Sequence, residues 1–594
     1  MKVSEYVAGF LADLSKRGSP YAPALAHRTR VYMVCGAGAM HLNDSICHHP
    51  GIDVMAFHHE QAATFAAEAD ARVTNDIAVV HVTAGPGGTN TVTGLACAYV
   101  DSIPLLVIAG QVTSHTMVKH TGCRQLGMNE LDMVSIVQPV TKYAITVLEP
   151  FMIRYHLERA VSAAMSGRRG PVWVEIPLDV QAAEIDSERL TGFNDAEVAV
   201  IGNTTYLREK AAEVVAMLDR AERPLLLIGN GVRLAGACSE MRELVQRLGI
   251  PVVSSWNASD IIPTDHGCYI GRCGIFGDRM SNSAVQNADL ILAIGTRLSV
   301  AQIGHHANLF APKAKKIIVD IDRNESDKPT VRADLVVTAD ARDFLVRLLE
   351  RAVPRLEEFW FDKPCPVGRW VDTPAGAGVD AYRFVELLNE HLDDGAIVVT
   401  DVGFSFIPAM QRLRLKEGQR LFHSSGVSPM GWGLPAAIGA CRAAPSRQII
   451  CLTGDGGLMM NLQELQTIAH HRLPISIFVF ANDGYATMRI AQNNHFGRES
   501  VAGVKSGLSI PDLVDLAEGF GLFCKVLPSA ESLSWWAAWD VLPEFVILEM
   551  APGQVIAPRV QSRTRDGKFI PTPLDDMWPY PTESESLHKE PVHG

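Results

Sequence analysis

The sequence predicts an α/β protein built from three doubly wound, parallel-sheet domains. Apolar runs of strand length alternate along the chain with helix-length segments, a rhythm typical of parallel sheets with crossover helices. Most of these runs end at loops rich in Gly, Pro or small residues. Two passages without clear periodicity divide the 594 residues into three blocks, and a chain of this length is expected to form several domains.

The first block is expected to cover residues 1–183. Its N-terminal segment, residues 1–18, carries charges within an apolar stripe, so we expect an amphipathic helix rather than a signal peptide. The strands expected in this block are Val31–Val34, Ile77–Val82, Pro104–Gly110 and Pro171–Pro177.

The second block is expected over residues 204–353, after a polar and charged linker at 184–203. A second linker, at 357–378, is rich in Pro and Gly and separates this block from the third. The strand-like runs of the second block are Arg223–Gly231, Ala288–Arg297 and Lys315–Asp322.

The third block is expected over residues 379–558. It repeats the order of strand, loop and helix of the first block, which suggests two related folds. The remaining residues, 559–594, are polar and rich in Pro, and we expect them to form an extended tail on the surface. The strand-like runs of this block are Gly395–Gly403, Gln448–Gly457, Pro474–Asp483 and Glu544–Met550.

Composition excludes several classes of function. The 53 Lys and Arg residues against 66 Asp and Glu give a formal charge of −13, which disfavours binding to nucleic acid. No uninterrupted apolar stretch approaches the roughly 18 to 20 residues of a membrane span, so no membrane association is expected. The 11 cysteines are scattered without a CxxC pair, so we expect neither disulfides nor a zinc site, but reduced thiols in a cytoplasmic protein.

The most informative segment is the GDGG motif at 454–457, between an apolar strand and a helix-like segment. Asn482 follows Asp455 by twenty-seven positions, at the end of the next apolar strand, and Gly484 comes soon after. A carboxylate, an amide oxygen and a backbone carbonyl make half of the octahedral shell that Mg²⁺ prefers, which diphosphate oxygens and a water would complete. Alternatively, both segments are ordinary turns, since Gly, Asp and Asn favour turns. The glycines that would let the backbone approach a diphosphate are Gly454, Gly456 and Gly457.

This spacing of GDG and Asn482 resembles that of thiamine diphosphate (ThDP) enzymes, most closely the acetolactate synthase branch of their decarboxylases and carboligases. The resemblance covers most of the chain and implies a pyrimidine-binding, a central and a diphosphate-binding domain, in that order. It also implies that Asp455, Asn482 and the Gly484 carbonyl are the Mg²⁺ ligands. Ala481 stands where the family usually has the first Asn of a pair, but the ligand is the second.

A second match places the acid that activates the cofactor. Residues Phe57–Arg72 resemble the family helix that bears its catalytic glutamate, which falls on Glu60. In the family this carboxylate exchanges a proton with the pyrimidine ring and favours the imino tautomer, whose nitrogen takes the C2 proton. Without the motif, Glu60 would be an acid at the start of an apolar helix, where the helix dipole favours it.

Two more segments resemble cofactor contacts of the family. In Ser428–Ala440, Met430 corresponds to the residue that wedges the cofactor into a bent shape, and the Ser428 carbonyl to the acceptor of the pyrimidine amine. Val82–Gly110 resembles the family's glycine-rich loop, helix and strand. Taken alone, a Met in an apolar run fills a core gap, and a glycine-rich loop is a structural turn. The other residues expected at the cofactor are Gly85, Pro86, Gly87, Tyr485 and Ala486.

The second block carries glycines at strand ends and a later acidic pair, which suit a dinucleotide lying across a sheet. Relatives of acetolactate synthase often hold flavin adenine dinucleotide (FAD) there, so FAD is a candidate cofactor. No GxGxxG is present, and the alternative is a central domain that is empty or holds another ligand. The segments concerned are Gly229–Arg233, Gly271–Asn282, Gly295–Arg297 and Asp320–Asp322.

The sequence also departs from the family pattern. Residues 128–130 are Met-Asn-Glu where acetolactate synthases usually have Phe-Gln-Glu, so the catalytic-pocket amide, Asn129, is shortened. Residues 404–405 are Phe-Ser in place of a Gln-His pair that touches the diphosphate, which must find other donors. Gly484–Ser500 lacks the usual tryptophan-bearing sequence, and with the tail at 557–579 it looks more like relatives from surface-polysaccharide or branched-sugar pathways.

The resemblance implies a ThDP- and Mg²⁺-dependent enzyme that decarboxylates a 2-oxo acid, pyruvate in first place, and transfers the two-carbon unit to a second carbonyl compound. Transfer to pyruvate would give acetolactate, and transfer to a nucleotide-linked keto-sugar a branched sugar. A flavin-dependent 2-oxo acid oxidase and a catalytically silent cofactor-binding scaffold are the alternatives. In the family fold, Glu60 of one chain faces Asp455 and Asn482 of its partner, which implies a homodimer or homotetramer with the site between subunits.

Overall fold

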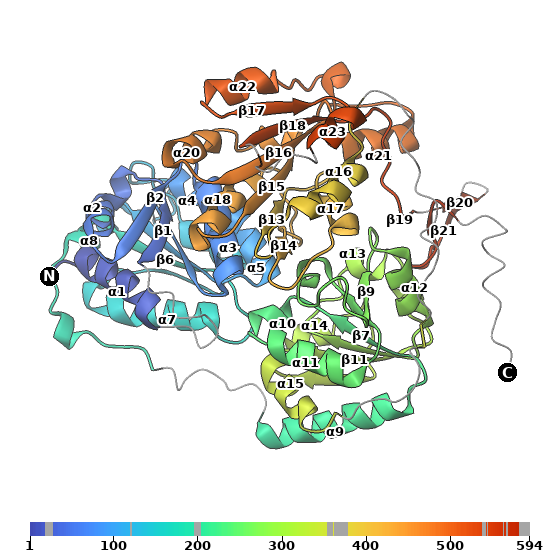
Figure 1. Ribbon diagram of the computed structural model, residues 1–594. Helices are drawn as coiled ribbons and strands as arrows, with labels where there is room; N and C mark the ends of the chain where they lie inside the picture. Colours follow the sequence, from blue (N-terminus) through green and yellow to red (C-terminus); the bar gives the residue numbers. More distant parts are fainter. Residues whose placement is uncertain are drawn as a thin grey trace.

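The computed structural model describes residues 1–17, 28–118, 121–194, 203–352, 360–361, 378–536, 542, 544–561, 563–565 and 568–580. It contains three parallel six-stranded sheets, each within an α/β unit, which confirms the predicted fold class. Figure 1 shows the N-terminal unit in blue beside the C-terminal unit in orange, with the central unit in green packed against both. Most of the predicted linker at 357–378 lies outside the described residues, as do residues 195–202 and 581–594.

The N-terminal sheet has the order β2-β1-β3-β4-β6-β5, and all its pairs are parallel. Its strands alternate between two cores: Val31 and Met33 pack beneath the helices of one face, and Tyr32 beneath those of the other. Its strands are β1 Thr29–Met33, β2 Ile52–Ala56, β3 Ala78–Val82, β4 Leu105–Gln111, β5 Tyr143–Thr146 and β6 Val172–Pro177. Its helices are α1 Val3–Arg17, α2 Met40–His48, α3 Glu60–Thr74, α4 Pro86–Thr89, α5 Val92–Asp101, α6 Met133–Val137, α7 Ile153–Met165 and α8 Leu178–Ala182.

The central sheet has the order β12-β11-β10-β7-β8-β9, so the chain moves outward from β7 in both directions. This is the dinucleotide-fold order, whose switch point lies between β7 and β10. Its strands are β7 Pro224–Ile228, β8 Val252–Ser254, β9 Tyr269–Arg272, β10 Leu290–Ile294, β11 Lys315–Asp320 and β12 Leu335–Thr338. Its helices are α9 Thr204–Arg220, α10 Gly231–Leu234, α11 Cys238–Leu248, α12 Arg279–Asn287, α13 Val300–Ile303, α14 Arg323–Ser326 and α15 Ala341–Leu349.

The C-terminal sheet has the order β14-β13-β15-β16-β18-β17, which repeats the strand order of the N-terminal sheet. The two related folds expected from the sequence are therefore present. Its strands are β13 Ile397–Thr400, β14 Arg420–Phe422, β15 Ile449–Gly454, β16 Ile475–Ala481, β17 Cys524–Leu527 and β18 Phe545–Glu549. Its helices are α16 Ala381–Leu388, α17 Phe406–Arg412, α18 Gly433–Ala443, α19 Asp455–Leu458, α20 Glu464–His471, α21 Ala486–Phe496, α22 Leu513–Gly519 and α23 Ala530–Trp536.

The described part of the tail differs from the extended surface tail that its composition predicts. Leu574 and Met577 are buried, and Leu574 joins the core of the central unit. The amide of Asn282 on α12 donates to the Leu574 carbonyl at 3.0 Å. The tail forms two antiparallel pairs from short strands: β19 Arg559–Val560 with β22 Met577–Trp578, and β20 Arg563–Arg565 with β21 Lys568–Ile570.

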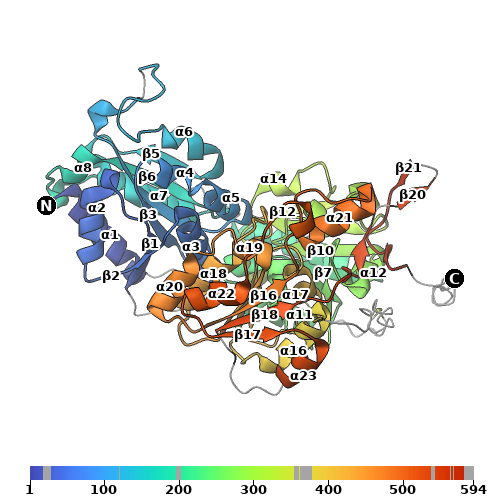
Figure 2. The same ribbon diagram turned by 90° about the horizontal axis from the view of Figure 1, so that it is seen from above.

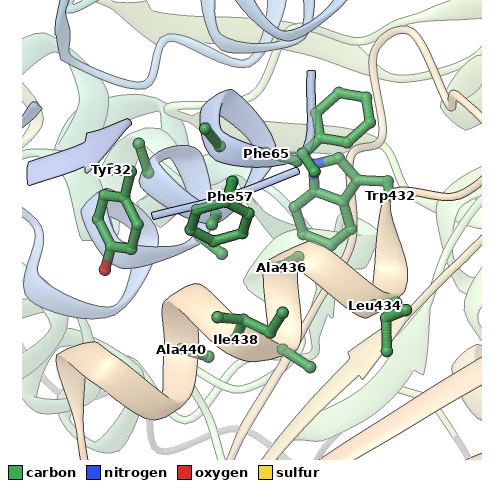
Figure 3. Close-up of a cluster of buried hydrophobic side chains, with 14 of the residues drawn as sticks. Tyr32, Phe57, Phe65, Trp432, Leu434, Ala436, Ile438 and Ala440 are labelled. Carbon is green, nitrogen blue, oxygen red and sulfur yellow. The ribbon is translucent and has the colours of Figure 1, made fainter. Parts of the chain in front are cut away.

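Helices α3 and α18 join the two related units through one continuous core (Figure 3). Phe65 of α3 and Trp432 just before α18 are fully buried there, and the Trp432 indole donates to Glu68 at 2.6 Å. The backbones approach closely, because a Cβ on Gly439 would lie 1.9 Å from the Ala66 carbonyl oxygen. The view from above shows the same two helices between the sheets (Figure 2).

The helices of the described ranges include none long and apolar enough to cross a membrane. None of the ten cysteines within those ranges forms a disulfide.

Candidate active site at the carboxyl ends of the terminal sheets

The three predicted metal ligands meet at the ends of the adjacent parallel strands β15 and β16. Asp455, the first residue of α19, accepts hydrogen bonds at Oδ2 from the backbone N–H groups of Asn482, at 2.8 Å, and Gly484, at 3.1 Å. Its Oδ1 accepts from the Gly456 N–H at 2.7 Å. Burial raises the pKa of the Asp455 carboxyl, and these N–H groups oppose the rise.

The donor set at this point fits a hard divalent cation. The side-chain oxygen Oδ1 of Asn482 is buried and accepts no hydrogen bond from the described residues. A buried acceptor without a partner is rare in folded proteins, and a bound cation would satisfy it. No group of three or more His, Cys, Asp or Glu side chains that could hold a metal occurs in the described part of the chain. The predicted set contains only one carboxylate, with an amide oxygen and a carbonyl, as Mg²⁺ accepts.

The glycines of the GDGG motif serve two different purposes. A Cβ on Gly456 would lie 2.6 Å from the Tyr485 ring, and a Cβ on Gly457 would lie 2.9 Å from Oδ2 of Asp401. Packing against protein atoms therefore requires these two glycines. Gly454 differs, because a Cβ there would meet no atom within 4 Å among the described residues beyond its chain neighbours, so the space beside it is open. Ala486 begins α21 and packs against the core of the C-terminal unit.

The segment with Ser428 and Met430 lies between β14 and α18. Ser428 is exposed and has a left-handed backbone, with φ of 54°, and Gly431 has a φ of 78°. Met430 is half-buried. The Gly431 N–H donates to both oxygens of Asp401 at 3.1 Å, and burial raises the pKa of Asp401 to about 6.

Glu60 lies in the N-terminal unit at the first position of α3, where the family helix predicts it. Its side chain is buried, and the Asn90 amide donates to its Oε2 at 2.9 Å. Gly87 lies close by, since a Cβ there would come within 3.6 Å of Glu60 Oε1. His59 caps the helix by accepting a hydrogen bond from the Gln61 N–H at 3.1 Å.

Asn129 lies next to the glycine-rich loop that begins at Gly85. Both residues are left-handed, each with a φ of 64°, and a Cβ on Gly85 would lie 2.2 Å from the Asn129 carbonyl oxygen. Pro86 is the first residue of α4. The neighbouring carboxylate of Glu130 is buried and accepts from the N–H groups of Val118, at 2.7 Å, and Leu126, at 3.2 Å. The structure therefore brings Glu60, Gly85, Gly87 and Asn129 to one edge of the N-terminal sheet.

Within one chain, the two groups of predicted residues are linked only indirectly. Among the described residues no hydrogen bond or ion pair joins Glu60 to Asp455, Asn482 or Gly484. The neighbouring residue Gln61 accepts a hydrogen bond from Asn461 at 3.3 Å, and Asn461 also donates to the Gly431 carbonyl at 2.9 Å. The His58 N–H donates to Glu464 at 3.2 Å.

Sequence reasoning missed three polar residues of this region. Asp401 directly follows β13 and accepts a hydrogen bond from the Gly431 N–H. Its place in an Asp-Val-Gly sequence at the end of that strand is the signal that could have found it. Asn90 orients Glu60, but nothing in its local sequence marks it. Arg489 of α21 donates to the backbone carbonyl of Asn482. Phe404, which replaces a polar family residue, is buried in the C-terminal core.

The central unit contains a large cavity at the switch point between β7 and β10. Its volume is about 1170 Å³, which includes space open to solvent, and all four of the glycine-rich or acidic segments singled out in the sequence contribute to its lining. Gly231 and Gly295 approach so closely that a Cβ on Gly231 would lie 2.7 Å from the Gly295 Cα. Burial raises the pKa of Asp320, at the end of β11, to about 6.

The cavity wall also has features that suit a dinucleotide. The indole N–H of Trp256 is buried, finds no acceptor among the described residues, and belongs to a lining side chain. Arg297 lines the wall and places its positive charge near the switch point. Its guanidinium lies 3.7 Å from the Asp101 carboxylate. Arg168 closes one side through ion pairs with Asp322, at 3.0 Å, and Glu325, at 2.7 Å. These residues fit a ligand with phosphates and ribose hydroxyls.

Comparisons with known proteins agree with this architecture. The chain matches three families: the thiamine pyrophosphate enzyme N-terminal TPP binding domain at 24–135, the central domain at 211–348, and the C-terminal TPP binding domain at 401–533. It is 34% identical to a probable acetolactate synthase large subunit of Methanocaldococcus jannaschii, over 78% of this chain and 79% of that protein.

Two bacterial proteins give similar matches. The acetolactate synthase isozyme 1 large subunit of Escherichia coli is 32% identical, over 82% of this chain and 84% of its own. The acetolactate synthase large subunit of Lactococcus lactis is 31% identical, over 82% and 83%. The chain therefore belongs to the thiamine diphosphate enzymes, within their acetolactate synthase-like branch, and is a ThDP-dependent carboligase.

Proposed function

We propose that this carboligase uses ThDP and Mg²⁺ to decarboxylate pyruvate and transfer the two-carbon unit to a second carbonyl compound. The observation that carries the proposal is the buried Oδ1 of Asn482, which finds no hydrogen-bond partner among the described residues, in a residue whose backbone N–H donates to Asp455 at the ends of two adjacent strands. The names of the relatives, acetolactate synthase large subunits, support the pyruvate donor.

Asp455, Asn482 and the Gly484 carbonyl would hold Mg²⁺, and through it the diphosphate. Gly454 offers the open approach, because among the described residues, its two chain neighbours aside, no atom lies within 4 Å of its Cβ position. When bound, ThDP supplies the carbanion centre that adds to the 2-oxo acid. The other glycines of the motif keep the turn compact against Tyr485 and Asp401.

Glu60 would hold a proton at its carboxyl beside the pyrimidine. The Asn90 amide fixes Oε2 through the 2.9 Å hydrogen bond, so the remaining oxygen, Oε1, is the one that exchanges the proton. The half-buried Met430 and the left-handed Ser428 would shape the space above the diphosphate site. Asn129, exposed beside Gly85, would contact the substrate.

The site is completed by a second copy of the chain. Glu60 and Asp455 belong to different units of the fold, and each lies at the carboxyl end of a sheet with the same strand order. We therefore propose a homodimer or homotetramer, with the Glu60 side of one chain facing the Asp455 side of the other, and the same cytoplasmic setting as the sequence predicts.

The central cavity is proposed to hold FAD. Its position at the switch point, the paired glycines Gly231 and Gly295, and the cation Arg297 support a dinucleotide there. A purified protein with a flavin absorbance spectrum after dialysis supports this part of the proposal. A protein that takes up no FAD at micromolar concentrations contradicts it.

One experiment tests the reaction. The purified protein is incubated with ThDP, Mg²⁺ and pyruvate, with and without candidate acceptors, while CO₂ is followed and products are identified by mass. We expect CO₂ and acetolactate from pyruvate alone. Release of CO₂ only in the presence of a keto-sugar would show that the keto-sugar, and not pyruvate, is the acceptor. Absence of CO₂ from a protein that binds ThDP would overturn the proposal that pyruvate is the donor.

A further inference from the structure

The segment of residues 425–431 is held at both ends by buried carboxylates. It carries Ser428 and Met430, and it adopts a left-handed backbone at Ser428 and again at Gly431. Such a backbone is costly for a residue other than glycine and persists only where surrounding contacts determine it. The contacts that determine this segment therefore matter for the cofactor geometry.

Asp401 holds the far end of the segment. Both of its oxygens accept from the Gly431 N–H at 3.1 Å, and Oδ2 also accepts from the Thr453 hydroxyl at 3.1 Å. Its Oδ1 accepts from the Val402 N–H at 2.9 Å, and the side chain is almost fully buried. One carboxylate thus joins the Met430 segment to the residue that precedes Gly454 of the diphosphate turn.

Asp101 holds the near end of the segment from the other related unit. The last residue of α5, it accepts from the Ser425 N–H at 3.0 Å and from Arg72 at 2.7 Å. Although burial opposes it, the Arg72 and Arg297 guanidiniums hold the pKa of Asp101 below its ordinary value. Gly426 must be glycine at this contact, because a Cβ there would lie 2.3 Å from Val100.

We propose that Asp101 and Asp401 are positioning residues of the reaction, which fix the 425–431 segment and so place the Ser428 carbonyl and Met430 against the cofactor. The inference rests on the proposed ThDP chemistry and adds two residues that touch neither metal nor substrate. It further implies that the segment is pinned from two units of the same chain, before any second copy is added.

The test compares three variants of the full-length protein: Asp401→Asn, Asp101→Asn and, as a matched control, Asp278→Asn. Asp278 of the central unit also accepts a backbone N–H, that of Arg272 at 2.9 Å, but does not contact the segment. The readouts are the Kd of ThDP in the presence of Mg²⁺, by calorimetry, and the near-ultraviolet circular dichroism of bound ThDP. Thermal unfolding without cofactor reports the purely structural cost.

We expect Asp401→Asn to weaken ThDP binding about 10- to 100-fold, because the amide NH₂ that replaces one carboxylate oxygen cannot accept a hydrogen bond. The variant should also change the dichroism of bound ThDP. Asp101→Asn should weaken ThDP binding about tenfold, and Asp278→Asn less than about twofold even if it lowers the Tm. If Asp401→Asn does not fold, Thr453→Val removes one of the same hydrogen bonds and should shift both readouts in the same direction.

The outcomes separate this inference from the proposed function. A wild-type protein that binds no ThDP would overturn both. Folded Asp101 and Asp401 variants with the wild-type Kd and the wild-type dichroism would overturn the inference alone, and so would an Asp278 variant that changes both readouts as much as they do.

Discussion

The N-terminal and C-terminal sheets have the same strand order, yet they carry different chemistry at the same positions. In each, the third strand runs into a glycine and then a short helix, α4 after Gly85 and α19 after Gly454. The first residue of that helix is Pro86 in one and Asp455 in the other. The shared topology places the two short helices at equivalent positions, and the Asp455 carboxylate is the reason why we propose the metal site in the C-terminal unit.

The second strands extend the comparison. After β2 the chain enters α3 at Glu60, and after β14 it passes through the 425–431 segment into α18. The two helices then pack against each other, so equivalent elements of the two units form one core. An acid lies at the helix start in the first unit and a left-handed segment in the second. The same architecture thus carries the proposed proton-exchanging group, Glu60, on one side and the segment proposed to shape the cofactor on the other.

The largest effect should come from substituting the first residue of each short helix, Asp455 in α19 and Pro86 in α4. Asp455→Ala removes the only carboxylate of the proposed Mg²⁺ ligand set and should lower kcat by about 10³-fold or more, with loss of Mg²⁺-dependent ThDP binding. Pro86→Ala changes the equivalent position of the other unit and should change kcat less than about tenfold. Steady-state kinetics with a Mg²⁺ titration measures both. Equal losses in the two variants would mean that the units do not divide the work as described.

A smaller loss is expected on the N-terminal side. Glu60→Gln removes the exchangeable proton and should lower kcat by about 10² to 10⁴-fold, while ThDP still binds. Asn90→Ala frees Oε2 of Glu60 and should cost about tenfold. Calorimetry of ThDP binding beside the kinetics separates the two effects. If Asn90→Ala were as inactive as Glu60→Gln, the Asn90 amide would be more than an orienting group.

The contact between the two units can be broken without touching the site. Gly439→Ala places a methyl group where the Ala66 carbonyl lies, 1.9 Å away, and should destabilise the protein by about 1–3 kcal/mol. Gly9→Ala on α1 meets nothing within 4 Å and should stabilise it by about 0.4–1 kcal/mol. Thermal unfolding of both variants checks the prediction. A lower Tm for Gly9→Ala, or an unchanged one for Gly439→Ala, would contradict the packing described.

Much of this arrangement could be predicted from the sequence. Apolar runs ending in glycine or acid mark the parallel strands and their carboxyl ends, so the sequence predicts that Asp455, Asn482 and Gly484 lie together, as they do in the structure. The first and third blocks repeat the same order of strand, loop and helix, which likewise predicts two sheets of one topology.

The remaining features depend on contacts between distant segments, which no local pattern records. Asn90 reaches Glu60 across thirty positions, and Asp101 meets Ser425 across 324. The composition predicts that Leu574 belongs to a polar surface tail, but the structure buries it in a hydrophobic core cluster of the central unit. Proximity of this kind follows from the packing of the units, so periodicity and spacing cannot reveal it.

The smallest effect concerns a buried glutamate of the N-terminal sheet to which we assign no role in the candidate active site. Glu175 lies on β6, and burial raises its pKa from 4.5 to about 7. The folded state binds the Glu175 proton more tightly than the unfolded state does. The contribution of Glu175 to the free energy of unfolding is therefore fully present below about pH 4.5 and is lost as the pH rises through about 7. Glu175→Gln should therefore gain stability relative to the wild type between pH 5 and pH 8, by on the order of 1–2 kcal/mol. Urea unfolding midpoints across this range measure the gain, and parallel stability curves for the two proteins would show that Glu175 titrates normally.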